Sequence, residues 1–315
     1  MITLIELFAG IGTQYQAFKN NYEVKCIGIS EIDPRPLKAY KALFGEPNNF
    51  GDITKIKKLP ESDVWTYSFP CTDLSIAGKQ EGFEGKHSSL IYEVYRLLCV
   101  SPKPEVLIME NVANICNTKF MPQFQDWIDT LTELGYTSTW KKIKANIYGG
   151  ATIRERVYMI SILNANNTKY NFPPAIHQDK VLQDFLEPIK NEYYIDEYHG
   201  PAPNTIKNFS NSIKLCDYKK GGQGNRVYSP YGMGVTLTAT GGGKAGSSGG
   251  LYYRENKIYK LSPIEMCKVM GWSKEQAQII CSVLTPREVG FCMGNAIDLA
   301  VLTKIVAGIK EQNIL

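Results

Sequence analysis

The sequence predicts an α/β protein: a doubly wound, parallel sheet with helices on both faces, followed by a smaller domain. From the start to about residue 165, short apolar runs alternate with longer segments of helical periodicity, the pattern of a parallel sheet with crossover helices. After residue 164 the composition shifts to Asn, Pro, Tyr and Lys and then to glycine, with 11 of the 27 glycines between 221 and 250. That density of glycine favours loops over packed helices.

The elements of the first domain follow from this alternation. Candidate strands are the ranges Thr3–Phe8, Val24–Ile29, Val64–Ser68, Val106–Met109 and Val157–Ile162. Candidate helices are the ranges Thr13–Asn20, Pro34–Phe44, Ser88–Val100 and Phe120–Leu134. We expect a first domain over 1–175, a second over 176–285, and a C-terminal helix within 286–315 that returns to cover the first sheet.

The bulk composition narrows the class of protein. The 315 residues carry 35 basic and 31 acidic side chains, a formal charge of +4, which tolerates an anionic partner without requiring one. Eight cysteines without a C-x-x-C pair and three dispersed histidines predict no metal site and a reduced, cytoplasmic setting. The N-terminus has no basic leader and no apolar run approaches the roughly 20 residues of a membrane span, so we expect no membrane.

Polar residues that follow the first strands predict a ligand site, because ligands bind beyond the carboxyl ends of strands in such sheets. Phe8-Ala9-Gly10-Ile11-Gly12 is a glycine turn between a strand and a helix, and Glu31 follows about 20 residues later. This spacing indicates an adenosine-containing cofactor whose ribose Glu31 would bind, although a solvated charge is the alternative for Glu31. Asp52 could accept from an adenine amino group or be an ordinary turn aspartate.

Reactive groups follow the next strands. Cys71 comes after Pro70 and before a glycine-containing loop, where a thiol is either a nucleophile or a small buried hydrophobe. Glu110 ends an apolar strand, where desolvation would raise its pKa, or else it caps the next segment. Arg154 and Arg156 precede a strand, a position that also suits an ordinary surface pair.

Taken in order, these segments resemble the cytosine-C5 DNA methyltransferases along nearly the whole chain. The matching segments are Phe8-Ala9-Gly10-Ile11-Gly12, Gly51-Asp52-Ile53, Ser68-Phe69-Pro70-Cys71, Ser75 to Phe83, Met109-Glu110-Asn111-Val112, Arg154-Glu155-Arg156, Leu261 to Glu265 with Met270-Gly271, and Gly294-Asn295-Ala296. The resemblance implies a Rossmann-like methyltransferase domain that uses S-adenosyl-L-methionine and releases S-adenosyl-L-homocysteine, without a metal.

The resemblance also implies roles for individual residues. Cys71 would attack cytosine C6, Glu110 would contact N3 and the exocyclic amine, and Arg156 would bind O2 with support from Arg154. The implied cofactor-binding residues are Phe8, Ala9, Gly10, Ile11, Gly12, Glu31, Ile32, Asp52, Ile53, Pro70, Leu90 and Asn295.

The second domain resembles the target-recognition region of the HhaI-type enzyme, which methylates within GCGC. The resemblance is carried by the Gly-Gly-Gln-Gly-Asn-Arg stretch at 221–226, Val235 to Thr238, and the glycines at 241–243. It implies that the cytosine is flipped out of duplex DNA, that Gln223 fills the gap, and that Arg226 reads guanine. Ser75, Lys79, Thr236 and Gly243 would also lie along the DNA.

Four positions depart from the family pattern. Thr72 follows the Pro-Cys pair and Thr152 precedes the arginine pair, where the family usually has Gln. Ala77 and Thr240 replace a serine and an aromatic ring of the HhaI-type enzyme, which leaves the recognition sequence open. None of the four removes a group needed for bond making.

We therefore expect a monomeric cytoplasmic enzyme of a bacterial or phage-infected cell that acts on double-stranded DNA, as part of a restriction-modification system or as an orphan methylase. A cognate restriction endonuclease, if present, would make no direct contact. The alternatives are a transfer-RNA cytosine-C5 methyltransferase, a nicotinamide-dependent oxidoreductase, and a DNA-binding protein without catalysis. The transfer-RNA branch lacks support because its Cys-Phe-Thr signature is absent.

Overall fold

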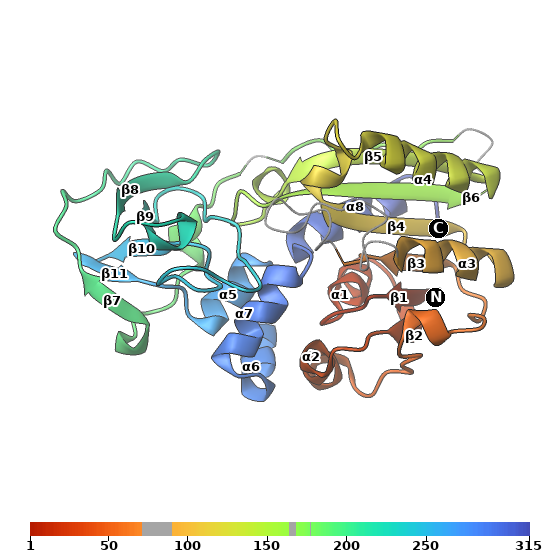
Figure 1. The fold of residues 1–315 in the computed structure, drawn as a ribbon, viewed down its shortest axis with the longest axis horizontal. Helices are drawn as coiled ribbons and strands as arrows, with labels where there is room; N and C mark the ends of the chain where they lie inside the picture. Colours follow the sequence, from red (N-terminus) through yellow and green to blue (C-terminus); the bar gives the residue numbers. More distant parts are fainter. Residues whose placement is uncertain (71–89, 164–167, 177) are drawn as a thin grey trace.

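A six-stranded sheet organises the first part of the chain in the computed structural model, which describes residues 1–70, 90–163, 168–176 and 178–315 (Figure 1). The strand order is β2-β1-β3-β4-β6-β5. The strands are β1 (Ile2–Leu7), β2 (Val24–Ser30), β3 (Val64–Tyr67), β4 (Val106–Val112), β5 (Tyr136–Lys144) and β6 (Glu155–Leu163). The order reverses between β1 and β3, so the carboxyl ends of these strands form the crevice where such sheets bind ligands.

The sheet is not wholly parallel, which corrects the sequence-based expectation. β1 to β4 are parallel, but β6 is antiparallel to both β4 and β5. β5 was not predicted, because its lysines at 141, 142 and 144 make the segment polar. β5 is one of the two edge strands in the order, and edge strands commonly carry lysine.

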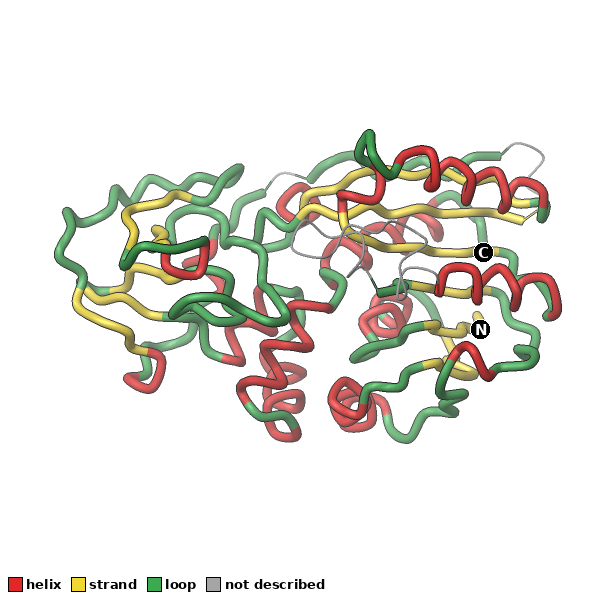
Figure 2. Tube along the Cα trace, viewed as in Figure 1, coloured by secondary structure: helices red, strands yellow, loops and turns green. Residues whose placement is uncertain are grey.

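Helices cover both faces of this sheet, so the predicted α/β fold class is confirmed (Figure 2). The helices of this part are α1 (Thr13–Lys19), α2 (Pro34–Phe44), α3 (Ile91–Val100) and α4 (Met121–Glu133). Successive residues of β1 point to opposite cores: Leu4 packs in the cluster that contains Phe18 of α1, and Ile5 in the cluster that contains Leu97 of α3 and Trp127 of α4.

The second part contains a five-stranded sheet in the order β7-β11-β10-β9-β8. Its strands are β7 (Tyr194–Glu197), β8 (Ile213–Asp217), β9 (Arg226–Ser229), β10 (Leu251–Arg254) and β11 (Lys257–Tyr259). Apart from β9, the glycine-rich stretch 221–250 forms turns and loops without a long strand or α-helix. This sheet lies apart from the larger one, with helices between them (Figure 1).

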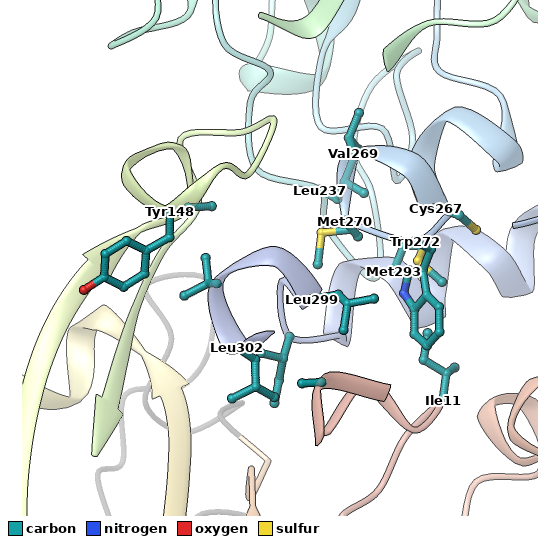
Figure 3. Packing of buried hydrophobic residues seen from close by; sticks show 14 of the residues in the cluster. Ile11, Tyr148, Leu237, Cys267, Val269, Met270, Trp272, Met293, Leu299 and Leu302 are labelled. Carbon is teal, nitrogen blue, oxygen red and sulfur yellow. The ribbon is translucent and has the colours of Figure 1, made fainter. Parts of the chain in front are cut away.

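Four helices follow the second sheet: α5 (Pro263–Val269), α6 (Lys274–Val283), α7 (Pro286–Asn295) and α8 (Leu299–Glu311). The stretch 286–315 thus holds two helices where one was expected, because the backbone is extended at Ala296 and at Asp298, which caps α8. α8 lies against α1, where the Asn20 amide donates to the Thr303 hydroxyl at 3.1 Å. Figure 3 shows Leu299, Leu302 and Met293 of these helices in one hydrophobic cluster with Ile11 of the glycine turn.

By length and composition, residues 286–311 are apolar enough to cross a membrane, and 61% of that apolar window is buried inside the fold. The same pattern arises when helices form the core of a globular protein, and the interruption between α7 and α8 fits that origin.

Candidate active site

The glycine turn after β1 leaves room for a ligand against its backbone. Phe8, Gly10 and Gly12 have φ angles of 60°, 59° and 82°, in the left-handed region that favours glycine. A Cβ at Gly10 would meet no atom within 4 Å, so the space in front of this residue is open. A Cβ at Gly12 would lie 2.5 Å from the Phe44 ring, so the second glycine serves close helix packing.

The Glu31 carboxylate links this turn to the end of β2. Its Oε2 accepts from the Gly10 amide at 2.9 Å, and its Oε1 accepts from the amides of Ile32 and Asp33 at 2.8 and 2.7 Å. Burial raises the pKa of Glu31 above its usual range, and these backbone donors hold the shift in check. Each oxygen retains lone-pair capacity that a ribose hydroxyl could use.

The third segment of this site is held beside Glu31 by Asn49, a residue that the sequence analysis did not single out. The Asn49 side chain donates to the Glu31 carbonyl at 2.9 Å and accepts from the amides of Glu31 and Gly51 at 3.2 and 2.9 Å. Asp52 follows, and its Oδ1 accepts from the backbone and side chain of Thr54, which lowers its pKa. Asp52 is thus a turn cap whose carboxylate still faces solvent.

One apolar side chain beside Glu31 is exposed to solvent. Ile32, two residues beyond the end of β2, is 72% exposed. Asn295, the last residue of α7, is exposed, and Leu90, which precedes α3, is half-buried. The side chains of Ala9, Ile11 and Ile53 are buried, so these three could meet a cofactor only through their backbones.

Buried Glu110 and half-buried Arg156 form an ion pair at the carboxyl end of β4. Glu110 lies inside β4, which continues two residues beyond it to Val112, and Arg156 lies in the neighbouring strand β6. Arg156 Nε is 3.3 Å from Glu110 Oε1, yet this buried oxygen makes no hydrogen bond with any described residue. Burial raises the pKa of Glu110, and the positive charges of Arg156 and Arg154 limit the rise.

Arg154 does not face Glu110 directly but ties β6 to the α7–α8 connection. Its guanidinium donates to the carbonyls of Gly294 at 3.2 Å and of Ala296 at 2.7 Å, on either side of Asn295. Burial and the charge of Arg156 lower the pKa of Arg154 to about 10. Arg154 therefore positions Asn295, a task that its place in the sequence did not indicate.

Asn111 connects the Glu110 strand to the segment that leads to Cys71. Its side-chain amide donates to the Phe69 carbonyl at 3.1 Å, and both groups are buried. Phe69 precedes Pro70, so this hydrogen bond fixes the chain just before the proline. Cys71, Ser75 and Lys79 lie outside the described residues, as do the departures Thr72 and Ala77.

The predicted DNA-binding residues of the second sheet lie around two glycine-rich loops. Gln223 and Arg226 are exposed at the start of β9, and Gly243 is exposed on the neighbouring loop with a φ of 61°. Thr236 is half-buried, and Thr152 pairs with Gly234 at the junction of the two sheets.

No group of three or more His, Cys, Asp or Glu side chains in the described part of the chain is arranged to hold a metal ion. The candidate site has two parts. One is the open glycine turn after β1 with the Glu31 carboxylate, and the other is the Glu110–Arg156 ion pair beside the segment that leads to Pro70.

The chain resembles known methyltransferases in sequence and in fold. Residues 2–311 match the family described as C-5 cytosine-specific DNA methylase. The chain is 32% identical over 285 residues to the Type II methyltransferase M.HhaI of Haemophilus parahaemolyticus, a match that covers 86% of this chain and 84% of the relative. It is 31% identical over 310 residues to M.MspI of Moraxella sp, covering 97% and 70%.

Solved structures share the fold at lower identity. The Dnmt2 methyltransferase of S. pombe superposes with a TM-score of 0.75 at 18% identity and covers 99% of this chain and 100% of its own. The Entamoeba histolytica methyltransferase EhMeth gives 0.75 at 17% identity, with 99% of each chain covered. The family match does not favour the transfer-RNA alternative and leaves the oxidoreductase and non-catalytic alternatives without support. With a match along almost its full length, this chain belongs to the C-5 cytosine-specific DNA methylase family.

Proposed function

We propose that this enzyme flips a cytosine out of duplex DNA and methylates it at C5, with Cys71 as the nucleophile and S-adenosyl-L-methionine as the methyl donor. The observation that carries the proposal is the Glu110–Arg156 pair: a buried carboxylate oxygen without a hydrogen-bond partner in the described residues lies 3.3 Å from a guanidinium nitrogen. Buried polar atoms normally have a hydrogen-bond partner. The N3 and amino edge of cytosine would supply one.

Each protein group has a defined task in this reaction. The Cys71 thiolate forms a bond to C6, and the ring electrons move toward N3 and O2. Glu110, whose pKa is raised by burial, supplies or stabilises a proton at N3, while Arg156 binds O2. C5 then takes the methyl group, loses its proton to a base, and the C6–S bond breaks to restore the C5–C6 double bond and the thiolate.

The residues around the glycine turn fit S-adenosyl-L-methionine, which supplies an electrophilic methyl group when bound. The open space at Gly10 admits a ligand against the backbone, and Glu31 retains acceptor capacity for ribose hydroxyls. The exposed Ile32 offers an apolar surface to an adenine ring, and burying it would contribute about 1.5 to 3 kcal/mol. Phe8, Asp52, Pro70, Leu90 and Asn295 complete the proposed cradle.

In the second sheet, we propose that Gln223 occupies the space left by the flipped base and that Arg226 reads guanine, with Thr236 and Gly243 along the DNA. Ser75 and Lys79 would contact phosphates. The target would be a short sequence containing CG, with GCGC as one candidate. The proposed division into a catalytic domain (1–175), a recognition domain (176–285) and a returning C-terminal segment (286–315) assigns chemistry and recognition to separate sheets.

We further propose that the enzyme acts as a cytoplasmic monomer, within a restriction-modification system or as an orphan methylase of a bacterial or phage-infected cell. A cognate endonuclease would recognise the same sequence without binding this chain. Bisulfite sequencing of treated DNA would identify the methylated sequence.

A mechanism-based trap tests the nucleophile. Purified protein with S-adenosyl-L-methionine should form a covalent adduct with duplex DNA that contains 5-fluorocytosine, because fluorine at C5 prevents the final elimination. Cys71→Ala should form no adduct and transfer no methyl group, while it still binds the cofactor in calorimetry. Methyl transfer by Cys71→Ala would refute the assignment, and transfer to transfer RNA but not to duplex DNA would refute the proposed substrate.

A further inference from the structure

Two glycine-rich loops of the second sheet fit together more closely than side chains would permit. A Cβ on Gly224, in the loop 221–226, would overlap the backbone of Gly242 in the loop 241–245, and a Cβ on Gly243 would overlap the Asn225 side chain. The Ala245 amide donates to the Gly224 carbonyl at 2.9 Å. The two loops therefore form a single surface.

The Asn225 carboxamide joins these loops at two lysines. Its Oδ1 accepts from the Lys244 amide at 2.9 Å, and its Nδ2 donates to the Lys220 carbonyl at 3.2 Å. One side chain thus fixes the spacing between two lysine backbones. Arg226 directly follows Asn225 and is the first residue of β9.

Both lysines are exposed, and neither lies within ion-pair distance of a carboxylate in the described part of the chain. Two other lysines of this region differ: Lys207, between β7 and β8, pairs with Asp184 at 2.9 Å, and Lys214 of β8 pairs with Asp217 at 2.6 Å. Unpaired ammonium groups beside a candidate base-reading arginine complement a negatively charged ligand.

We propose that Lys220 and Lys244 bind backbone phosphates of the DNA on either side of Arg226, with Asn225 as the positioning residue that sets their spacing. This inference rests on the proposed function. A lysine on a flexible stem acts as a point charge for phosphate and carries no sequence information, whereas an arginine fork can read guanine. The lysines would hold the loops on the DNA while Arg226 selects the sequence.

Salt dependence of binding separates these roles. We would measure the affinity for duplexes of several sequences from 50 to 200 mM salt, by fluorescence anisotropy, for the wild type and for Lys220→Ala and Lys244→Ala. Each lysine that neutralises a phosphate contributes roughly 0.9 to the slope of log K against log salt, so each variant should lose about that much. The loss of affinity should be equal for all sequences, whereas Arg226→Ala should reduce the preference among them.

Two controls keep the result specific. Lys207→Ala and Lys214→Ala remove the same charge from the region of β7 and β8, at lysines that already have carboxylate partners, and should leave the slope unchanged. Asn225→Ala should lower the slope and raise KM for DNA while leaving KM for the cofactor at the wild-type value, which a general loss of structure would not do.

An unchanged slope in Lys220→Ala and Lys244→Ala would overturn the inference, and so would an equal loss in Lys207→Ala. If the wild-type protein binds no duplex DNA at all, the proposed function fails instead. The two failures are therefore distinguishable in the same titration.

Discussion

The buried side-chain amide of Asn111 in β4 helps to position the segment around Phe69 and Pro70, which follows β3. Its donation to the Phe69 carbonyl joins β4, which carries Glu110, to the chain just before Pro70. This hydrogen bond adds to the pairing of β3 with β4 and fixes Phe69 beside the strand that carries the proposed proton donor. Catalysis that depends on such placement loses rate steeply with small displacements.

We predict that Asn111→Asp lowers kcat by about 10²-fold, because the new carboxylate would face the Phe69 carbonyl and displace the Pro70–Cys71 segment. Cofactor affinity should change little, since Asn111 makes no contact with the glycine turn in the described residues. Single-turnover methylation and cofactor calorimetry would measure the two effects. Equal losses in both would show that Asn111 acts only on general stability.

Some site residues could be predicted from sequence because local pattern places them. Glu31 and Glu110 occur at the ends of apolar strands, and polar residues there point to a ligand site in this class of sheet. Asn49, Asn111 and the partners of Arg154 could not be found in this way. Their hydrogen bonds join segments up to 142 residues apart, which only the folded chain brings together.

At the level of elements, two glycines on one face of α7 allow this helix to pack closely against residues 238–247 of the glycine-rich stretch. A Cβ on Gly294 would overlap the backbone of Thr238 and Ala239, and a Cβ on Gly290 would lie 2.6 Å from the Ser247 side chain. Asn295 ends the same helix, so α7 connects the proposed cofactor cradle to the proposed DNA surface.

We predict that Gly294→Ala destabilises the protein by about 1 to 3 kcal/mol, because backbone atoms opposite the new methyl group cannot move aside without strain. Arg287→Ala, at an exposed position of the same helix, is the matched control and should change stability by less than about 0.5 kcal/mol. Urea denaturation would measure both. A neutral Gly294→Ala would mean that α7 and the loops separate easily.

β5 illustrates where element prediction failed. Its three lysines make the segment look polar in the sequence. It forms a strand because it pairs with β6 along its whole length, from Tyr136 opposite Leu163 to Lys144 opposite Glu155. Strands β1, β3 and β4 were predictable because most of their residues are buried and apolar, and the edge strand β2 because most of its residues are apolar despite Lys25. An edge strand with one solvated face loses that signal.

Across the whole molecule, buried and ion-paired carboxylates respond to pH in opposite directions. Burial raises the pKa of Glu6 from 4.5 to about 7 and that of Asp298 from 3.8 to about 6. Ion-paired acids such as the half-buried Glu187 have lowered pKa values, through hydrogen bonds from Lys268 and Lys274. Stabilisation from the first group is lost as pH rises, and that from the second is lost as pH falls through their folded pKa values.

We therefore predict a stability maximum near pH 5. Glu6 is buried in β1, with its carboxylate bonded to the Tyr40 hydroxyl at 2.7 Å and the Tyr15 amide at 2.9 Å. A pKa raised from 4.5 to about 7 corresponds to about 3 kcal/mol of folding stability that is lost between pH 4.5 and 8. Glu6→Gln should retain most of that stability at pH 8. Denaturation midpoints measured from pH 4 to 9 would reveal a flat profile above pH 5 if Glu6 titrates elsewhere.

The pairing of α1 with α8 has a consequence for how the protein is made. The Asn20 side chain meets its partner Thr303 across 283 residues, and the Phe18 cluster is completed by Val306 of the same late helix. During synthesis, the apolar face of α1 stays exposed to solvent until α8 has left the ribosome. Chaperone association of the nascent enzyme should thus persist until α8 emerges.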